Sequence, residues 1–416
     1  MAATTLTVYP EAASVHEGRL SIGGCDAVEL ARELGTPAYV MAEDDLRARA
    51  REYREALRAH HDGPGEVVFA SKAFPCSAVL RLFAEEGLSC DVASGGELHL
   101  ALAAGFDPRR IYLHGNAKSE RELSLAVDAG VGCVVIDNAD DVAKLERIVP
   151  PGRRQRVMLR VTPGVWADTH AAILTGHPES KFGLGLRDAA ALADDPPDHL
   201  DLVGLHIHIG SQLFDLAPYR EAIAAIAGLG DFPVYNLGGG MAAAYTHEDR
   251  PPGADASVAA IVGAAHALLG PDKTLVIEPG RALVANAGIT LYTVESVKQA
   301  LVAVDGGMSD NLRPMLYDAV YEAEIADRFT RGPDDGAPYA VVGKHCESGD
   351  VLVRRTRLRD PRPGDVLVTP VTGAYGHALA NNYNGVPRPP VIFCSGGEAR
   401  VVVRRETYED LLARDV

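Results

Sequence analysis

Short apolar segments and amphipathic segments alternate along the middle of the chain. The apolar segments predict buried strands, and the segments between them, several of which begin at a capping residue and end at Gly, predict helices. In the helix predicted at 119–129, Ser119 and Glu122 form a capping-box pattern and Gly130 is the stop. The predicted strands are 37–41, 67–72, 89–92, 111–114, 134–137, 157–161, 202–209, 234–237 and 275–278.

Strands that alternate with helices are typical of a parallel sheet with crossover helices. Nine candidate strands before residue 281, without internal sequence repetition, favour an eight-stranded (β/α)8 barrel of the TIM type in which one candidate is spurious or peripheral. A doubly wound sheet is the alternative. The other helices predicted in this region are 77–86, 97–104, 138–148, 218–228 and 255–269.

A different pattern follows Gly288, where β-rich segments are separated by Gly and Pro turns. It predicts a C-terminal β-sandwich or β-barrel domain. We therefore expect a barrel domain at 38–285 and a β domain at 286–416, to which residues 1–37 add a strand. The predicted strands are 5–9, 289–297, 300–304, 339–342, 351–353, 366–369, 391–393 and 399–403, with a helix at 26–34.

Polar side chains recur at the carboxyl ends of the predicted barrel strands, which form the catalytic rim of a parallel barrel. Lys72 ends one apolar strand, and a Lys at a buried strand end is either ion-paired or functional. The other polar positions at strand ends are Ser71, Asp91, Ser94, His114, Arg160, His206, His208, Ser211, Gly238–Gly240, Glu278 and Arg281.

These residue types suggest a particular cofactor. Gly238–Gly240 form either a tight turn or a phosphate cradle of backbone N–H groups. His208 alternates with His206, so one of them should face inward as a core residue or a ring stacker. Glu278 needs a cationic partner, either Arg281 or a protonated ring nitrogen. With a Lys for a Schiff base, this set describes a pyridoxal-phosphate site.

The composition points to a small-molecule partner. The 416 residues include 57 acidic and 40 basic side chains, and the formal charge of −17 argues against nucleic acid or an anionic membrane. The first residues lack the pattern of a signal peptide, and no apolar run approaches the roughly 20 residues of a membrane span, so we expect a cytoplasmic protein. The six cysteines show no metal-binding spacing, which predicts reduced thiols and no metal.

Seven motifs carry a resemblance to a known family. The chain resembles the alanine-racemase-fold (type III) pyridoxal-phosphate-dependent decarboxylases, and among them the diaminopimelate decarboxylases, with the motifs in family order from about residue 37 to the end. It departs from the family pattern at Met241–Ala244, which puts the shape of that loop in doubt. The motifs are Ala70–Ala73, Asp91–Leu98, His206–Gln212, Glu278–Arg281, Arg313–Tyr317, Cys346–Asp350 and Gly373–Tyr375.

The resemblance implies a pyridoxal-phosphate barrel, a β domain and a head-to-tail homodimer with shared active sites. By motif position, Lys72 would hold the cofactor as a Schiff base, His208 would stack on its ring, and Glu278 would face the pyridine nitrogen. The remaining cofactor-binding positions that it implies are Asp91, Ser211, Gly239, Gly240, Gly280, Arg281 and Tyr375.

The implied reaction is decarboxylation of meso-2,6-diaminopimelate to L-lysine and CO2. Cys346 would be the proton donor and, with Glu347, would come from the partner subunit; a Cys that simply packs as a small hydrophobe is the alternative. Two Arg suit the distal carboxylate and Glu347 the distal ammonium. The implied substrate-binding positions are Arg281, Arg313, Tyr317, Glu347 and Tyr375.

Three other interpretations stay open. A sister decarboxylase could act on another or a carrier-bound amino acid with the same cofactor residues. A racemase on the same barrel would be expected to pair the pyridine nitrogen with Arg rather than with Glu278, which makes this interpretation weaker. A catalytically silent pyridoxal-phosphate-binding homologue is the third, although the chain retains both Lys72 and Cys346.

Overall fold

The computed structural model describes residues 7–165, 180–329 and 336–416. The chain divides into two compact units. We call residues 49–242 and 251–280 the barrel unit, and residues 1–48, 243–250 and 281–416 the β unit. The domain limits expected at 38–285 and 286–416, with 1–37 joined to the second, stay predictions.

The barrel unit contains a closed barrel of parallel strands, in the order β10-β11-β12-β5-β6-β7-β8-β9. This closure confirms the predicted (β/α)8 architecture in preference to the doubly wound sheet. The strands are β5 (Gly65–Ala70), β6 (Ser89–Val92), β7 (Ile111–Leu113), β8 (Cys133–Ile136), β9 (Gln155–Arg160), β10 (Leu200–His206), β11 (Val234–Asn236) and β12 (Thr274–Ile277).

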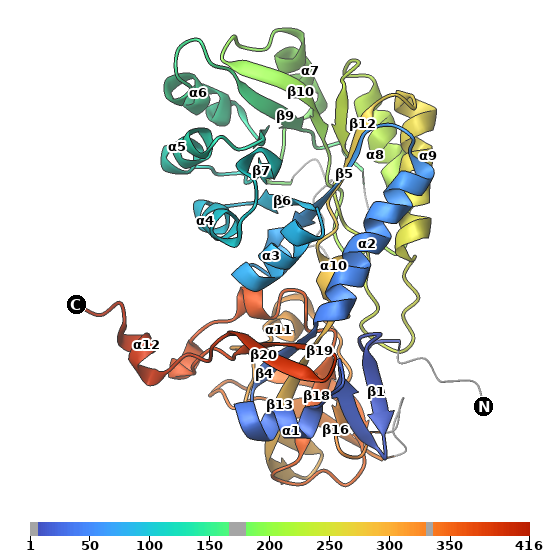
Figure 1. Ribbon diagram of the computed structural model, residues 1–416, viewed down its shortest axis with the longest axis vertical. Coiled ribbons are helices and arrows are strands. Elements are labelled where there is room, and N and C mark those ends of the chain that lie inside the picture. The colour runs from blue at the N-terminus through green and yellow to red at the C-terminus, as the bar shows by residue number, and fades with distance from the viewer. Residues whose placement is uncertain (1–6, 166–179, 330–335) are drawn as a thin grey trace. The chain divides into compact units, whose positions relative to one another are not determined.

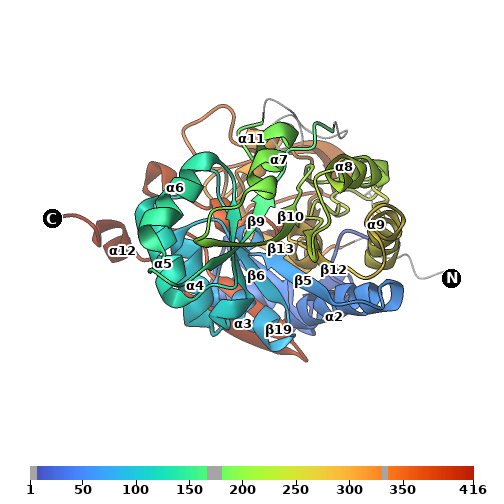
Figure 2. The same ribbon diagram turned by 90° about the horizontal axis from the view of Figure 1, so that it is seen from above.

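Helices surround these strands, as Figure 2 shows from above. Two helices that we did not predict are α2 (Glu43–His60), which runs from the β unit into the barrel unit, and α7 (Leu186–Asp194). The predicted ones are α3 (Ser77–Glu85), α4 (Gly95–Ala104), α5 (Glu120–Ala129), α6 (Ala139–Ile148), α8 (Ala217–Ala227) and α9 (Ala254–Leu269).

Capping residues fix several of these helix ends. The predicted capping box of α5 is present, because Ser119 accepts a hydrogen bond from the Glu122 N–H and Glu122 bonds back to the Ser119 N–H. Gly130 then ends the helix in the left-handed conformation that glycine adopts without strain. Ser94 caps α4 in the same way, through the Glu97 N–H.

The barrel interior is a packed core rather than a pore. A cluster of buried side chains from β5, β7, β8, β9, β11 and β12 fills it. The polar residues at one end of the barrel therefore lie above a packed apolar layer. Cys133 belongs to this cluster as a small apolar residue, and burial raises its pKa to about 12. The members are Val68, Tyr112, Cys133, Met158, Val234 and Val276.

The β unit is built on a nine-stranded sheet (Figure 1). Its strand β4 (Ala38–Ala42) pairs antiparallel with β13 (Gly288–Lys298) and parallel with β19 (Val391–Ser395). This strand is the ninth candidate of the barrel count, and it lies outside the barrel. The other strands of the sheet are β14 (Leu301–Val304), β15 (Glu324–Ile325), β16 (Ala337–Val342), β17 (Val351–Leu358), β18 (Val366–Pro370) and β20 (Glu398–Val403).

Residues near the amino terminus form a separate sheet within the β unit. It consists of β1 (Ala13–His16), β2 (Arg19–Ile22) and β3 (Cys25–Asp26), and the predicted helix follows as α1 (Ala27–Leu34). Of the strand predicted at 5–9, residues 5 and 6 lie outside the described residues and 7–9 form a turn and bend. The remaining helices are α10 (Arg281–Val284), α11 (Arg313–Tyr317) and α12 (Tyr408–Leu412). Over the described ranges, no helix combines the length and apolarity that crossing a membrane requires.

Replacing Ser119 by Ala should lower the free energy of unfolding of the barrel unit by about 1 kcal/mol, because the N–H of Glu122 loses its capping oxygen. Urea unfolding followed by circular dichroism measures this change. Ser124→Ala, within the same helix, is the matched control and should be nearly neutral. Equal stability of the two variants would contradict the capping role.

Candidate active site

Lys72 lies just beyond the carboxyl end of β5. The strand ends at Ala70, and Ser71–Ala73 form a single 3-10 turn. The Lys72 side chain is exposed, so the expectation of a buried strand-end Lys is wrong, because the turn lifts it off the sheet. Its positive charge acts on both Asp91, the third residue of β6, and His208, which follows β10. The rim therefore brings these three predicted residues into one electrostatic neighbourhood.

The carboxylate of Glu278 is the centre of a buried polar network at the end of β12. Its Oε1 accepts a hydrogen bond from Asn236 Nδ2 at 2.6 Å, and its Oε2 lies 3.1 Å from His206 Nε2. His114 Nε2 forms an ion pair with Oε1 at 3.0 Å and lies 3.9 Å from an Asp91 oxygen. All of these residues are buried, and each belongs to or directly follows a different barrel strand.

This network keeps Glu278 ionised. Burial raises the pKa of Glu278, but His114 and His206 more than reverse this effect and hold it well below the usual range. Burial lowers the pKa of His206 to about 4, so this side chain is neutral. Burial also lowers the pKa of His114, but the nearby carboxylates of Asp91 and Glu278 outweigh it and leave the pKa raised. The network thus presents a negative carboxylate within the barrel.

His208 lies beside the glycine turn. Its Nδ1 accepts a hydrogen bond from the Gly239 N–H at 3.2 Å, so the edge of the imidazole ring is directed at the loop's backbone donor. Burial, Lys72 and Arg160 lower the pKa of His208 well below its usual value. Strand β10 ends at His206, so His208 lies beyond the strand and the predicted strand alternation does not apply to it. Both side chains bond to other residues of the rim, His206 to Glu278 and His208 to Gly239.

Gly238–Gly240 form a cradle that only glycine can build. A Cβ on Gly239 would lie 2.1 Å from the Glu278 carbonyl oxygen, and one on Gly240 would lie 2.6 Å from the Gly210 oxygen. Gly238 and Gly240 also have positive φ angles of 71° and 119°. Tyr219 donates a hydrogen bond to the Gly239 carbonyl at 2.7 Å, which fixes the turn. Met241–Ala244, the segment whose sequence differs from the family pattern, follows this turn directly.

Gly280 also approaches its neighbours closely, with a Cβ position 3.0 Å from that of Ala70. The end of β12 and the turn that carries Lys72 are therefore held together tightly. The backbone N–H of Ala70 donates to the carbonyl of Pro279, 3.4 Å away. Glu278, Gly280 and Lys72 thus share one end of the barrel, as their positions in the sequence predicted.

Other predicted residues form a cluster of arginine and tyrosine side chains in the β unit. Arg281 donates to the Tyr245 hydroxyl at 2.6 Å, and its guanidinium lies 4.9 Å from the Tyr375 ring centre. Arg313 lies 4.5 Å from the centre of the Tyr245 ring and donates to the Tyr321 hydroxyl. The two guanidinium groups therefore share one aromatic ring.

Arg313 has no carboxylate partner among the residues that the structure describes. It is 5% exposed, and its Nε has no hydrogen-bond partner in the same ranges. Burial lowers the pKa of Arg313, but the surrounding tyrosines outweigh it and leave the pKa raised, so the side chain stays charged. A buried cation without a counter-ion is costly, which makes this cluster suited to an anionic group. Tyr317 ends the same helix, α11, and is half-buried.

Cys346 and Glu347 also belong to the β unit, in a loop between β16 and β17. Cys346 is exposed, whereas the other five cysteines are buried, so its interpretation as a packed hydrophobe is wrong. Glu347 accepts a hydrogen bond from the hydroxyl of Tyr383. Both predicted residues therefore present their side chains at the surface of this unit.

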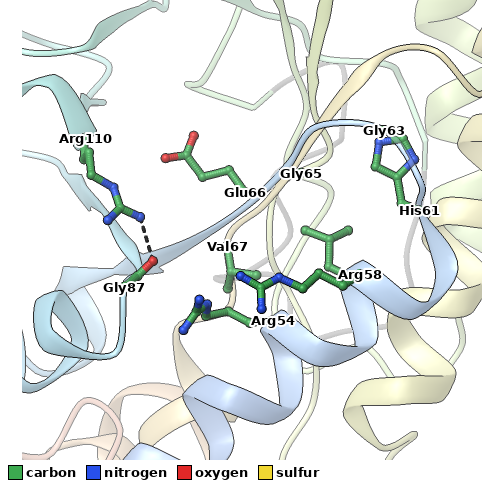
Figure 3. A pocket seen from close by; sticks show the side chains of 10 residues that line it. Arg54, Arg58, His61, Gly63, Gly65, Glu66, Val67, Gly87 and Arg110 are labelled. Atoms are coloured by element: carbon green, nitrogen blue, oxygen red, sulfur yellow. Dashed lines mark hydrogen bonds between the residues drawn. The ribbon is translucent and has the colours of Figure 1, made fainter.

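A pocket of about 340 Å³ lies at the opposite, amino-terminal end of the barrel strands (Figure 3). Its arginines have a structural role: Arg110 donates to the Gly87 carbonyl at 2.6 Å, and Arg54 donates to that of Glu86. These carbonyls end helix α3, where cationic side chains are favoured. The pocket shares no residue with the rim.

His114, His206 and Glu278 also place donor atoms within 4.8 Å of one another, a spacing that could hold a metal ion. Their hydrogen bonds and ion pairs already serve the Glu278 carboxylate. The expectation of no metal stays a prediction.

A family model described as "Pyridoxal-dependent decarboxylase, pyridoxal binding domain" matches residues 43–285. The closed barrel and its rim of Lys, His, Glu and Gly residues thus define a pyridoxal-dependent decarboxylase, and pyridoxal 5'-phosphate is the cofactor of this class.

Curated relatives narrow the class. The chain is 44% identical to the diaminopimelate decarboxylase of Bacillus subtilis (96% of this chain, 95% of the relative) and 45% identical to that of Actinosynnema pretiosum (98% and 95%). The crystal structure of M. jannaschii diaminopimelate decarboxylase in complex with L-lysine superposes with a TM-score of 0.88, at 31% identity and 98% coverage of both chains. The chain belongs to the diaminopimelate decarboxylase family.

Several residues of these clusters were not singled out as site candidates. Asn236 ends a short apolar strand, and its position at a strand end is the signal that could have found it. Tyr321 lies in an irregular segment, and Tyr383 and Asn384 lie in a 3-10 helix of three residues, so the sequence carries no periodicity to show which way these side chains point. His114 and His206 were placed at the rim, but their shared contact with Glu278 was not foreseen.

The free energy of unfolding should fall as the pH is lowered from 6.5 to 4, by up to about 3 kcal/mol from His206 alone. In this pH range His206 binds a proton in the unfolded state but stays neutral in the folded state. His114, with its raised pKa, acts in the opposite sense and above this window. His206→Gln should flatten the slope. Urea titrations at several pH values measure it, with His16→Gln, an exposed site, as the control; an unchanged slope in His206→Gln would contradict the assignment.

Proposed function

We propose that this protein decarboxylates meso-2,6-diaminopimelate to L-lysine and CO2. The observation that carries the choice of substrate is the pair of buried guanidinium groups around Tyr245, of which Arg313 has no carboxylate partner in the described residues. Membership of the diaminopimelate decarboxylase family supports the same reaction.

The residues of the barrel rim fit pyridoxal phosphate. The cradle at Gly238–Gly240 has no room for any Cβ, so its backbone could approach a phosphate closely, as a phosphate site requires. The Gly238 and Gly239 N–H groups themselves donate to Asn236 and His208. Glu278 is ionised and buried, so it would favour a protonated pyridine nitrogen. When bound, the cofactor supplies an electron sink for the pair of electrons that CO2 leaves behind.

We assign the following roles to the chain's own groups. Lys72 Nζ would hold the cofactor covalently, the neutral ring of His208 would lie against its ring, and Glu278 would orient it and retain the proton on its nitrogen. Asp91, whose charge raises the pKa of His114, would help to keep His114 protonated beside Glu278. The remaining cofactor contacts that we propose are Ser211, Gly239, Gly240, Gly280, Arg281 and Tyr375.

Arg281 and Arg313 would bind the distal carboxylate of the substrate, with Tyr317 and Tyr375 beside them. A planar guanidinium pairs with a carboxylate through two parallel hydrogen bonds. Ornithine and lysine lack that distal carboxylate, so they would leave the buried Arg313 cation without a counter-ion and be rejected. Glu347 would bind the distal ammonium, and the Cys346 thiol would deliver the proton to Cα.

Release of CO2 from the cofactor-loaded protein, with diaminopimelate, ornithine, lysine and arginine offered separately, tests the proposal. We expect release from diaminopimelate alone, and a kcat/KM about 100-fold lower in Arg313→Lys because the bidentate pairing is lost. Arg153→Lys, at an exposed site, is the control.

The alternatives predict different outcomes in the same assay. Release from another amino acid would show a sister decarboxylase. No release from any substrate by a protein that absorbs at the cofactor band would favour a silent homologue or a specialised substrate. Lys72→Ala should lose that band if Lys72 is the covalent attachment point.

We further propose that the protein is a head-to-tail homodimer in which Cys346 and Glu347 complete the partner's active site. The family resemblance and the position of both residues in the β unit, far from Lys72 in sequence, support this arrangement.

The expected cytoplasmic location of the protein also stays a prediction.

Mixing two inactive variants tests the shared site. Lys72→Ala and Cys346→Ala chains should together recover up to about a quarter of the wild-type activity, because random exchange gives half heterodimers with one intact site each. Exchange is verified by mass spectrometry of differently tagged chains. No recovery despite proven exchange would place both groups of one site in the same chain.

A further inference from the structure

The loop that carries Cys346 is closed by the carboxylate of Asp350, which also binds a neighbouring segment. Asp350 Oδ2 accepts from the His345 N–H at 2.9 Å, and its Oδ1 accepts from the Met308 N–H at 2.7 Å. Both Asp350 and His345 are buried, while residues 346–349 between them are exposed. A Cβ on Gly343 would lie 2.1 Å from Asp350 Oδ2, so the packing at the base of the loop is tight.

A second segment reaches over to the same loop through Asn384. Its Oδ1 accepts from the backbone N–H of Cys346 at 3.1 Å and lies 3.2 Å from His345 Nδ1. His345 Nε2 faces the N–H and the hydroxyl of Ser309, at 3.3 and 2.9 Å. Since the Ser309 N–H can only donate, Nε2 is the acceptor and Nδ1 carries the proton that His345 donates to Asn384.

Backbone conformation indicates that this contact is maintained at a cost. Asn384 has φ 55° and ψ 21°, the left-handed region that Asn tolerates better than most residues. Its neighbour Tyr383 stacks on His345, with ring centres 5.6 Å apart and planes inclined by 28°, and donates to Glu347. Three successive loop residues, from His345 to Glu347, therefore contact the pair Tyr383–Asn384 through ring stacking and hydrogen bonds.

We propose that Asn384 is a positioning residue that fixes the backbone of Cys346 so that its thiol is presented in one orientation. One side-chain oxygen accepts from two donors, and neither donor has another acceptor among the described residues: the Cys346 N–H lies in an exposed bend, and His345 is fixed from the other side by Ser309. This inference rests on the proposed function of Cys346 as proton donor.

The chain offers matched variants for the test. Asn384→Gly fits the left-handed backbone and removes the acceptor, so it should fold, whereas Asn384→Asp keeps an acceptor oxygen and should restore the contact. Asn382→Ala is the control, because Asn382 bonds to the Val386 carbonyl and to Glu406 instead of the loop. All variants are prepared as cofactor-loaded full-length protein.

In Asn384→Gly, hydrogen exchange in the peptide containing the Cys346 amide should accelerate about tenfold. Its kcat for diaminopimelate should fall about tenfold while KM changes less than about twofold and the cofactor absorption is unchanged, since misplacing a reacting group affects the chemical step. Asn384→Asp and Asn382→Ala should match the wild type in every readout.

Two results would overturn the inference, and they differ from failure of the proposed function. Exchange in Asn384→Gly equal to that of Asn382→Ala would show that Asn384 does not hold the loop. Faster exchange with unchanged kcat would show that the held orientation has no catalytic effect. If wild-type protein releases no CO2 from diaminopimelate, the proposed function fails, while the exchange measurement still decides whether Asn384 holds the loop.

Discussion

The buried carboxylate of Glu278 is the constraint on which the barrel rim depends. An ionised group inside a protein must be met by donors, and those of Glu278 come from side chains at or just after the ends of three other strands, at Asn236, His206 and His114. These side chains converge only if the parallel register places their strand ends at one level, since a slip of one residue turns a side chain to the other face. The register of the sheet is therefore also the geometry of the site.

The β unit contains buried positive charges, and it stabilises them in a different way. Among the described residues, Arg313 has aromatic faces and a hydroxyl group as partners instead of the acid that a buried Arg usually pairs with. Arg281 also donates to a tyrosine hydroxyl and lies against an aromatic ring. The tyrosines offset part of the free-energy cost of burying these two cations. The Nε of Arg313 is buried without a hydrogen-bond partner among the described residues, so part of the cost of removing it from water is not offset within them.

Local signals predicted much of the barrel. Ser119, Glu122 and Gly130 marked a helix whose two ends the structure reproduces, and the strands ended within a few residues of their predicted limits. Pairing partners were beyond reach: Ala38–Ala42 is apolar and buried throughout, like a barrel strand, and only long-range pairing with β13 and β19 separates it from one. Helix α2 was missed because its composition is strongly polar, which weakens the apolar period. Asn384 was missed because its role arises from contacts with a loop far away in sequence.

The place of β4 between β13 and β19 bears on how the chain is made on the ribosome. The nascent chain presents β4 early, yet one neighbouring strand begins at Gly288 and the other at Val391. All of the barrel strands, from Gly65 to Ile277, emerge in the interval. The barrel unit can thus collapse during translation while both edges of β4 are still unpaired. The edge that pairs with β13 can be covered once residue 298 has emerged, whereas the edge that pairs with β19 stays open to chaperones and other nascent chains until synthesis is almost complete.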